Sequence, residues 1–430
     1  MKASFYTLGC KVNQNETGAL MRLFSENGYE IAAEGEAADV YVVNSCTVTA
    51  GGDKKSRQWL RRAKREQPEA VTVLTGCFPQ AFPESALAVM EADIITGSAA
   101  RGQIVENVRR FLATKERIVD IVPHTKGEVY EELPLEDLQG HTRAFVKIED
   151  GCDRHCTYCV IPKARGNVRS RAESDILNEL RLLCEKGFAE MVLTGINLSS
   201  YGKDTNTNLE DITLKAAQID AVKRIRYGSL EPDLVTDAFI ERLCTCDKLC
   251  PQFHLSLQSG CDRTLKRMAR LYDTAQYENV VQRLRAAFPL ATFTTDIIVG
   301  FPDESEEDFA ESMAFIEKIG FLKVHVFSYS RREGTAAAKL AGQIPEAVKL
   351  ERSRAMQRHA DAVRAKIIGA MRGMHEEVLL ETPVNATTFT GYTRSYVPVL
   401  IKAPQAKQGD IVPVIVGEFD GERAAAECVR

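Results

Sequence analysis

The sequence predicts an α/β protein made of two parallel-sheet domains followed by a small all-β domain. Strand-like and helix-like segments alternate through residues 1–113 and again through residues 142–372. Such alternation is typical of parallel sheets whose faces are covered by helices. From residue 374 onward, short apolar strands separated by Gly and Pro turns replace this alternation, which indicates a sandwich or barrel.

The composition is that of an ordinary globular protein. The chain has 430 residues, of which 44% are hydrophobic and 27% are charged, so it can bury several cores. The net charge of −5 excludes a polycation, and any nucleic-acid contact must come from a local patch. No apolar run is long enough for a signal peptide or a membrane span. We therefore expect a cytoplasmic protein without a membrane partner.

The first domain, residues 1–113, shows four strand–helix units. We expect strands at 4–8, 39–44, 71–74 and 93–96, and helices at 16–27, 53–66, 83–90 and 103–112. Residues 114–141 have mixed charges and little periodicity, so we interpret them as a linker to the second domain.

Three cysteines occupy equivalent places in the first domain. Cys10 follows the first strand, Cys46 ends the second and Cys77 ends the third. Loops at the carboxyl ends of parallel strands meet at one edge of the sheet. A packing role is the better interpretation for any one of these cysteines alone. All three together, in a chain with twelve cysteines, favour a shared metal site.

The second domain, residues 142–372, repeats the strand–helix unit six times. Its expected strands are 144–148, 191–194, 226–229, 253–257, 292–299 and 323–327. Its expected helices are 173–186, 208–218, 236–244, 262–268 with 275–287, 306–319 and a long charged helix at 346–372. This order predicts a partial (βα)6, TIM-like barrel, with its chemistry at the carboxyl ends of the strands. A full eight-unit barrel is the alternative, but two more strands are not found.

Residues 373–430 are expected to form a small all-β barrel. Strands are predicted at 377–380, 386–392, 397–401, 411–416 and 424–429. Such barrels often bind nucleic acid. From His375 onward, however, five Lys and Arg face eight Asp and Glu, so charge gives this domain no support as an RNA clamp.

The loop after the first barrel strand carries Cys152, Cys156 and Cys159 within eight residues. This spacing can wrap three thiolates around one corner of an iron–sulfur cluster, which normally needs four ligands, so one iron is left open. Structural zinc is the alternative, but it needs four closed ligands. The remaining cysteines of this domain are interpreted as packing residues; a third metal site at 244–250 lacks a matching partner set. These cysteines are Cys184, Cys244, Cys246, Cys250 and Cys261.

Several short stretches carry a more specific signal. They are residues 7–14, 44–49, 75–77, 151–159 with 165–166 and 170–171, 255–260 and 299–302. In these stretches and in domain order, the chain resembles the radical S-adenosylmethionine methylthiotransferase family over essentially its whole length. The terminal barrel resembles a TRAM domain. Phe78-Pro79 departs from the more usual Tyr-Ala after the third cysteine.

The resemblance implies two 4Fe–4S clusters and S-adenosylmethionine as cofactors. Cys152, Cys156 and Cys159 would hold the cluster whose open iron binds S-adenosylmethionine. Cys10, Cys46 and Cys77 would hold an auxiliary cluster that delivers sulfur. One S-adenosylmethionine would methylate that sulfur, and a second would be cleaved to a radical that activates a C–H bond. No catalytic residue beyond the cluster ligands is expected, and an external electron donor and a sulfur source are implied partners.

Branches of this family modify adenosine 37 of tRNA, bearing an isopentenyl or a threonylcarbamoyl group, or an aspartate of a ribosomal protein. Residues 9–17 and 53–58 look most like the threonylcarbamoyladenosine branch. The expected product is 2-methylthio-N6-threonylcarbamoyladenosine. The other two substrates remain alternatives, and a non-catalytic iron–sulfur RNA-binding regulator is an alternative of another class.

Further site residues are expected from the resemblance and from their position. The backbone around Tyr158 should lie beside the adenine of the cofactor. Asn197, Gln258 and Asp296 follow or end barrel strands and are candidates for ribose or amino contacts, and Arg270 is a candidate partner of the methionyl carboxylate. Each of these residues could instead be an ordinary residue of the barrel mouth.

One helix of the first domain is strongly basic. It carries Lys54, Lys55, Arg57, Arg61, Arg62, Lys64 and Arg65. Only Asp53 and Glu66 oppose them. Phosphate contacts from such a patch would suit a tRNA partner, while a solvated surface helix is the alternative. Trp59 on the same helix is expected in the core.

Overall fold

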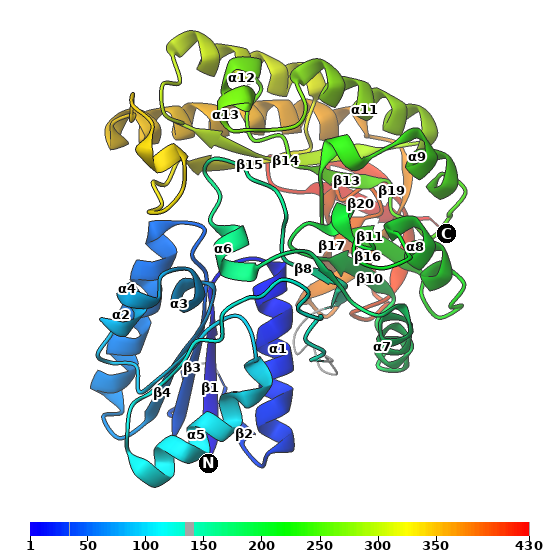
Figure 1. The fold of residues 1–430 in the computed structure, drawn as a ribbon. Helices are drawn as coiled ribbons and strands as arrows, with labels where there is room; N and C mark the ends of the chain where they lie inside the picture. Colours follow the sequence, from blue (N-terminus) through cyan, green and yellow to red (C-terminus); the bar gives the residue numbers. More distant parts are fainter. Residues whose placement is uncertain (34, 134–141, 430) are drawn as a thin grey trace.

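A computed structural model describes residues 1–33, 35–133 and 142–429 and contains the three predicted kinds of unit (Figure 1). The N-terminal sheet is fully parallel, with the strand order β2-β1-β3-β4-β5-β6. The strands are β1 (Lys2–Thr7), β2 (Glu30–Ile31), β3 (Val40–Ser45), β4 (Val71–Gly76), β5 (Ile94–Thr96) and β6 (Ile118–Asp120). The strands β1, β3 and β4, which precede the three N-terminal cysteines, are adjacent.

Two layers of helices cover this sheet. The helices are α1 (Lys11–Glu26), α2 (Ala50–Glu66), α3 (Cys77–Ala81), α4 (Pro83–Leu87) and α5 (Ile104–Thr114). Leu20 and Phe24 of α1 share one core with Val105 and Val108 of α5. Leu60 of α2 belongs to a second core, together with residues of α3 and α4.

Several features of this domain were not expected, among them strand β2, helix α3, the start of α1 and strand β6. Helix α1 begins at Lys11, five residues before the predicted start at residue 16. The sequence pattern did not reveal this first part of the helix, because its buried face carries the polar residues Asn13 and Asn15. Both side chains are buried and hydrogen-bonded to backbone carbonyls. Strand β6 lies within residues 114–141, which we expected to be a linker, and it extends the sheet by pairing with β5. Residues 134–141 of that expected linker lie outside the described residues.

The second domain is the partial parallel barrel that the sequence predicts. Its strands are β7 (Arg143–Lys147), β10 (Glu190–Thr194), β11 (Arg224–Tyr227), β12 (Ser229–Leu230), β13 (Gln252–Leu255), β14 (Thr292–Val299) and β15 (Lys323–Ser328). They pair as β11-β10-β7 and β12-β13-β14-β15, and β11 leads directly into β12. Because β11 and β12 lie where one strand was predicted, the barrel has six strand positions.

Helices cover the outside of this barrel. They are α7 (Glu173–Glu185), α8 (Leu209–Ala217), α9 (Asp237–Leu243), α10 (Asp262–Arg267), α11 (Thr274–Ala287), α12 (Glu306–Ile319) and α13 (Glu346–Ala370). Alternate strand residues such as Met191, Leu193, Phe253 and Leu255 pack under them in one large core. The residues between these, including Arg226 and His254, therefore face the inside of the barrel. This inner space is called the lumen below.

A short segment after β7 links the first two domains. It contains β8 (Glu149–Asp150), helix α6 (Ile161–Arg165) and β9 (Arg169–Ser170), and β8 pairs antiparallel with β9. Helix α6 lies between the N-terminal sheet and the barrel (Figure 1). Its neighbour on the N-terminal side is α3, which begins at Cys77.

The C-terminal domain is a closed five-stranded barrel with the order β16-β17-β18-β20-β19. Its strands are β16 (His375–Asn385), β17 (Thr388–Thr393), β18 (Pro398–Lys402), β19 (Ile411–Phe419) and β20 (Ala424–Cys428). It docks at the amino ends of the partial-barrel strands, where Arg143 Nε lies 2.7 Å from Glu381 Oε1. Arg226 Nη1 donates a hydrogen bond of 3.0 Å to the carbonyl oxygen of Arg394.

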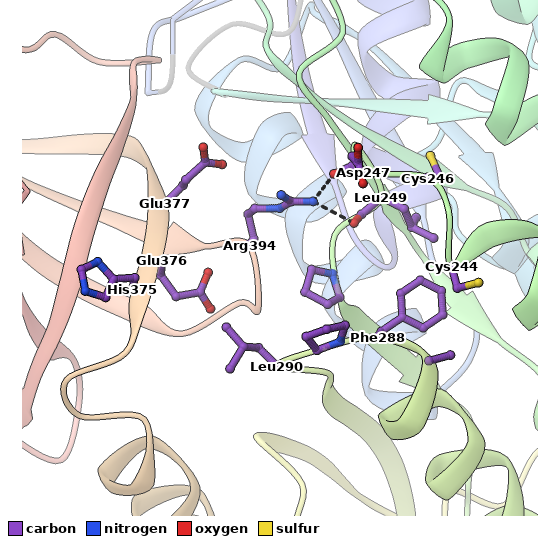
Figure 2. Close-up of a pocket in the computed structure, with 13 residues that line it drawn as sticks. Cys244, Cys246, Asp247, Leu249, Phe288, Leu290, His375, Glu376, Glu377 and Arg394 are labelled. Atoms are coloured by element: carbon purple, nitrogen blue, oxygen red, sulfur yellow. Dashed lines mark hydrogen bonds between the residues drawn. The ribbon is translucent and has the colours of Figure 1, made fainter.

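A pocket of about 420 Å³ lies at this junction (Figure 2). Cys244 and Cys246 line it together with His375, Glu376 and Arg394. Cys246 and Cys250 are buried, and Cys246 belongs to the barrel core, in agreement with the packing role expected for them. Cys244 is exposed, so the packing role expected for it is wrong. The pocket is at the amino ends of the strands, on the opposite side of the barrel from Cys152, Cys156 and Cys159. Within the described ranges, no helix is both long and apolar enough to cross a bilayer.

Candidate iron–sulfur and cofactor site

The three N-terminal cysteines lie at the carboxyl ends of three adjacent strands. Cys10 is the N-cap of α1, Cys46 follows β3 and Cys77 is the first residue of α3. Burial, and then the neighbouring Cys77 and Cys10 thiols, raise the pKa of Cys46 to about 12. The fold therefore places these three thiols within electrostatic range of one another, as their positions in the sequence predicted.

Two glycines allow this close approach. Gly9 has φ +119°, and a Cβ there would lie 2.8 Å from Cys46 Cβ. Gly76 has φ +96°, and a Cβ there would lie 2.5 Å from Asn44 Oδ1. Both conformations belong to the region that favours glycine. The chain therefore uses glycine to bring the cysteine loops together at this sheet edge.

The second cysteine set lies on the loop between β8 and α6. Gly151 has φ +87°, and a Cβ there would lie 1.9 Å from the carbonyl oxygen of Asn167. The Cys152 N–H donates to the carbonyl oxygen of Gly166 at 3.0 Å, and the Thr157 N–H donates to that of Met268, also at 3.0 Å. These backbone contacts hold both ends of the loop at the barrel mouth.

Each sulfur of this loop receives N–H donors. Cys152 Sγ accepts from the Arg154 N–H at 3.5 Å and from Asn197 Nδ2 at 3.8 Å. Cys156 Sγ accepts from Arg270 Nη1 at 3.1 Å, and Cys159 Sγ accepts from the Ile161 N–H at 3.4 Å. Donors that converge on sulfur suit thiolates, and hydrogen bonds to sulfur tune the potentials of iron–sulfur clusters. The arrangement fits a cluster bound through three thiolates.

The spacing of the thiols argues against a single metal ion. Among the described residues, the one set of three Cys, His, Asp or Glu whose ligand atoms all lie within 4.8 Å is His254, Asp296 and His325. A tetrahedral zinc site with Zn–S bonds of about 2.3 Å would bring its sulfurs to about 3.8 Å from one another. Neither cysteine set of the described chain has its three sulfurs within that limit, so neither is preformed for a tetrahedral zinc ion.

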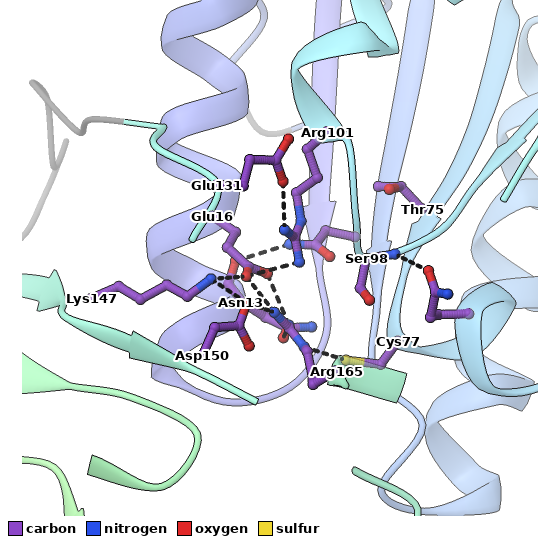
Figure 3. A network of polar contacts seen from close by, with 12 residues as sticks. Asn13, Glu16, Thr75, Cys77, Ser98, Arg101, Glu131, Lys147, Asp150 and Arg165 are labelled. Carbon is purple, nitrogen blue, oxygen red and sulfur yellow. Dashed lines mark hydrogen bonds and ion pairs between the residues drawn. The ribbon is translucent and has the colours of Figure 1, made fainter. Parts of the chain in front are cut away.

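A buried polar network connects Cys77 and α1 of the first domain with the segment that carries the second cysteine set (Figure 3). Arg165, at the end of α6, is fully buried, and its Nε donates to Cys77 Sγ at 3.1 Å. Its Nη2 donates to Asn13 Oδ1 at 2.7 Å, and its Nη1 is ion-paired with Glu16. Cys77 also packs against Val160 and Ala164, so it lies next to the residue that follows Cys159. The two sets are therefore neighbours across the domain boundary.

Glu16 is the hub of this network. It accepts ion pairs from Arg101 Nη2 at 2.9 Å and Lys147 Nζ at 2.8 Å, in addition to the pair with Arg165. Lys147 Nζ also lies 2.7 Å from Asp150 Oδ2. Burial opposes ionisation of Glu16, but the three cations outweigh it and hold the pKa near 2. Sequence analysis missed these residues, because the partners are up to 149 positions apart.

The structure places the expected cofactor residues in two groups. Asn197 and Arg270 contact the sulfurs of Cys152 and Cys156, as described above. Arg270 is also ion-paired with Glu231 and donates to the Tyr272 hydroxyl at 2.9 Å. Tyr158 lies in the cysteine loop, where burial raises its pKa well above the usual value.

Gln258 and Asp296 form the second group: Asp296 lies within β14 and not at its end, and Gln258 follows β13. The Gln258 N–H donates to the carbonyl oxygen of Asp296 at 2.9 Å. The side chain of Asp296 faces His254, whose Nε2 lies 3.3 Å from Asp296 Oδ2. His325 completes this group, and its ring lies 5.9 Å from that of His254. Neither histidine was singled out from the sequence.

Two buried acceptors beside Cys152 have no hydrogen-bond partner among the residues that the structure describes. The Asn197 N–H donates to Glu149 Oε2 at 2.7 Å, whereas Glu149 Oε1 and Asn197 Oδ1 are unpaired. Burial raises the pKa of Glu149 well above the usual value. Unpaired buried acceptors are costly. They fit a ligand with an amino or hydroxyl donor, such as S-adenosylmethionine.

The basic helix α2 is exposed but partly neutralised. Arg61 Nε lies 2.9 Å from Glu91 Oε1, Arg62 Nε lies 2.8 Å from Glu66 Oε1 and Lys64 Nζ lies 2.7 Å from Asp93 Oδ2. The Arg57 guanidinium stacks over the Phe78 ring. Lys54 and Lys55 are exposed. Trp59 is partly buried: its ring stacks on Tyr6 at 5.0 Å and packs against the core beside it.

Comparisons with known proteins agree with this architecture. Residues 2–97 match the model of "Uncharacterized protein family UPF0004", and residues 146–316 match that of the "Radical SAM superfamily". The solved structure of the radical S-adenosylmethionine methyltransferase TsrM from Kitasatospora setae aligns with a TM-score of 0.57 at 11% identity. The alignment covers 78% of this chain and 74% of the TsrM chain. At this low identity, the likeness supports the fold and no shared activity.

Curated relatives match nearly the whole chain. "Threonylcarbamoyladenosine tRNA methylthiotransferase MtaB" of Bacillus subtilis is 38% identical over 96% of this chain and 92% of its own length. The protein of the same name from Thermotoga maritima is 36% identical over 91% and 89%. "tRNA-2-methylthio-N(6)-dimethylallyladenosine synthase" of Clostridium perfringens is 33% identical over 94% and 93%. The identity to these relatives agrees with the two adjacent three-cysteine sites and with the partial barrel. The chain therefore belongs to the radical S-adenosylmethionine methylthiotransferase family.

Proposed function

We propose that this protein methylthiolates C2 of N6-threonylcarbamoyladenosine at position 37 of tRNA, giving 2-methylthio-N6-threonylcarbamoyladenosine. The observation that carries the proposal is the near-complete match to relatives named for this activity, at 36–39% identity. The adjacency of two three-thiolate sites supports it, because radical formation and sulfur delivery need separate metal centres that reach one substrate.

In this proposal Cys152, Cys156 and Cys159 hold one 4Fe–4S cluster, and Cys10, Cys46 and Cys77 hold a second. When bound, the clusters and S-adenosylmethionine supply the radical and the methylated sulfur. The protein supplies positions and charges. Arg270 and Asn197 direct N–H groups at the first set of thiolates, and Arg165 directs one at Cys77. These donors stabilise the anionic sulfur ligands.

S-adenosylmethionine would lie in the barrel mouth beside Cys152. The unpaired Glu149 Oε1 and Asn197 Oδ1 suit its ammonium group, with the backbone around Tyr158 beside its adenine. Gln258 and Asp296 remain candidates for its ribose. Arg270 remains a candidate for its carboxylate, and it would have to share its guanidinium with Glu231.

The tRNA backbone would be held by exposed cations, with α2 as the proposed patch. Lys54, Lys55, Arg57, Arg61, Arg62, Lys64 and Arg65 form this patch. Lys54 and Lys55 make no recorded ion pair in the part of the chain that is described, so they are available to phosphates. We also expect an external electron donor and a source of sulfur as partners.

Two measurements test the proposal. After anaerobic reconstitution, the chain should hold about eight irons, four at each site. A preparation that stays at four irons with all six cysteines intact would contradict the second cluster. Nucleosides of tRNA from a strain lacking the gene should lose 2-methylthio-N6-threonylcarbamoyladenosine and regain it with the intact gene. Loss of 2-methylthio-N6-isopentenyladenosine instead would move the substrate to the dimethylallyl branch. Unchanged tRNA would exclude both.

A further inference from the structure

Lys11 is the first residue of α1 and follows Cys10 directly in the sequence. Its Nζ lies 5.8 Å from the centre of the Phe145 ring, on a residue of β7 that faces the lumen of the partial barrel. Asp296 and His325, also in the lumen, lie within electrostatic range of it. Lys11 therefore extends from the N-terminal cysteine site into the space where the barrel opens.

The Lys11 side chain is exposed, whereas the Phe145 ring beside it is buried. The ammonium group therefore lies over an apolar ring at the edge of the lumen, where a ligand can reach it. A ligand of opposite charge would give it a partner that the ring does not supply.

The charged neighbours of Lys11 already have partners. Arg143 pairs with Glu381 at 2.7 Å, and Arg226 pairs with Glu190 at 2.7 Å. Asp296 Oδ2 lies 3.3 Å from His254 Nε2. Over residues 1–33, 35–133 and 142–429, no carboxylate is recorded within 4.0 Å of Lys11 Nζ. Lys11 is therefore a cation of this lumen that is available to an anionic ligand.

We propose that Lys11 binds the carboxylate of the threonylcarbamoyl group and so selects this substrate. The inference rests on the proposed function. The threonylcarbamoyl substituent ends in a free carboxylate, whereas an isopentenyl substituent is apolar and uncharged. A compact ammonium group suits a carboxylate, and a site built for a charged group strongly rejects an analogue that lacks it.

The position of Lys11 also agrees with the geometry of the base. N6 and C2 of adenine lie on the same edge of the ring, on either side of N1. When C2 is presented to the sulfur-delivery site at Cys10, the N6 substituent is near that site as well. A lysine adjacent in sequence to Cys10 is then in the place where the end of that substituent must be held.

S-adenosylmethionine carries a carboxylate too, so the test must separate the two sources. The main variant is Lys11→Met, which removes the charge and keeps an unbranched side chain, with Lys11→Arg as the conservative variant. Lys163→Met is the matched control. Lys163 Nζ lies 4.9 Å from the Phe82 ring centre, but the residue is exposed on α6. Iron content and thermal unfolding of each variant establish that it folds and takes up clusters.

Binding is measured by fluorescence anisotropy with anticodon stem-loop RNAs, in reconstituted protein without reductant. Three RNAs differ only at position 37: adenosine, threonylcarbamoyladenosine, and the methyl ester of the latter, which has no charge. For the native protein and for Lys163→Met, we expect the charged RNA to bind about tenfold more tightly than the ester. For Lys11→Met this difference should vanish, and Lys11→Arg should retain part of it. Binding of S-adenosylmethionine should be unchanged in all variants.

Three outcomes would overturn the inference. In one, Lys11→Met keeps the preference for the charged RNA. In the second, Lys11→Met loses binding of S-adenosylmethionine while it keeps the RNA preference, which would assign Lys11 to the cofactor. In the third, the native protein binds the ester and the charged RNA equally. If Lys11→Met does not fold, the affinities of the native protein for the charged RNA and for the ester still test the inference. Failure of the proposed function itself is seen separately, as threonylcarbamoyladenosine RNA that the native enzyme leaves unmodified.

Discussion

Arg165 links helix α6, which follows the Cys159 loop, to the N-terminal cysteine site through a single guanidinium. It contacts Cys77, Asn13 and Glu16 of the first domain from the end of α6, and it is fully buried. Removing one partner of a buried ion pair leaves an uncompensated charge, at a cost of about 3–5 kcal/mol. We expect Arg165→Met to lower the free energy of unfolding of the cluster-free protein by about this amount, measured by circular dichroism in urea.

Arg62→Met is the matched control for Arg165→Met. Arg62 lies on α2 and pairs with Glu66 at 2.8 Å, but 65% of its side chain is exposed. Exposed pairs contribute about 0–1 kcal/mol, so this variant should unfold close to the native protein. Equal effects of the two substitutions would contradict a structural role for the buried network.

Glu190 makes stability depend on pH at the junction with the C-terminal barrel. Burial opposes its ionisation, but Arg226, Arg143 and Arg224 outweigh burial and lower its pKa from 4.5 to about 2. A lowered pKa stabilises the folded state above the unfolded pKa. This contribution, about 3 kcal/mol, is lost as the pH falls from about 4.5 toward 2.

The corresponding variant is Glu190→Gln. At pH 7 it should unfold at lower urea than the native protein, and the difference should shrink between pH 5 and pH 3. Glu173→Gln removes the partly exposed pair with Lys215 and should change the urea midpoint little at either pH. A difference for Glu190→Gln that stays constant with pH would show that Glu190 acts through packing alone.

At the scale of the element, Gly151 decides whether the Cys152 loop can form. A Cβ at this position would lie 1.9 Å from the Asn167 carbonyl oxygen. We expect Gly151→Ala to lose the cluster of Cys152, Cys156 and Cys159, so iron content should fall by about half, from eight to four. The reconstituted variant should also release no 5′-deoxyadenosine with S-adenosylmethionine and reductant.

Gly127→Ala is the matched control for Gly151→Ala, because it places a Cβ on a left-handed backbone without a steric clash. Gly127 also has a left-handed conformation, with φ +79°, but a Cβ there would meet no atom of the described chain within 4 Å. This variant should keep its full iron content. If both variants lose iron alike, the close approach to Asn167 is not the reason.

Elements of this protein were predictable where one local pattern determines them. Strand β14 and helix α12 have the predicted bounds, because long apolar periodicity and the Ser305 capping box define them. Cys10, Cys46 and Cys77 could be grouped because parallel strands share one edge. Strand β6 is three residues long and gives too short a pattern. Lys11 and Arg165 could not be placed in the site, because their surroundings come from other domains.

At the scale of the whole molecule, a protein with a negative net charge can still bind RNA because its charges are unevenly distributed. The C-terminal barrel has more acidic than basic residues, whereas α2 exposes cations on the N-terminal domain. Several of these cations pair with Glu66, Glu91 and Asp93. Phosphate contacts should therefore depend most on Lys54 and Lys55, which are exposed.

The salt dependence of tRNA binding tests this distribution. Each phosphate contact contributes about 0.7–0.9 to the slope of log K against log salt. We expect Lys54→Gln/Lys55→Gln to reduce the slope by about 1.5, measured by filter binding between 50 and 200 mM salt as chosen conditions. Arg354→Gln/Arg358→Gln makes the same change in net charge at exposed positions of α13, on the barrel and not on α2. If both double variants change the slope equally, net charge governs binding. If only the α2 variant does, the N-terminal domain holds the tRNA backbone beside the two cysteine sites.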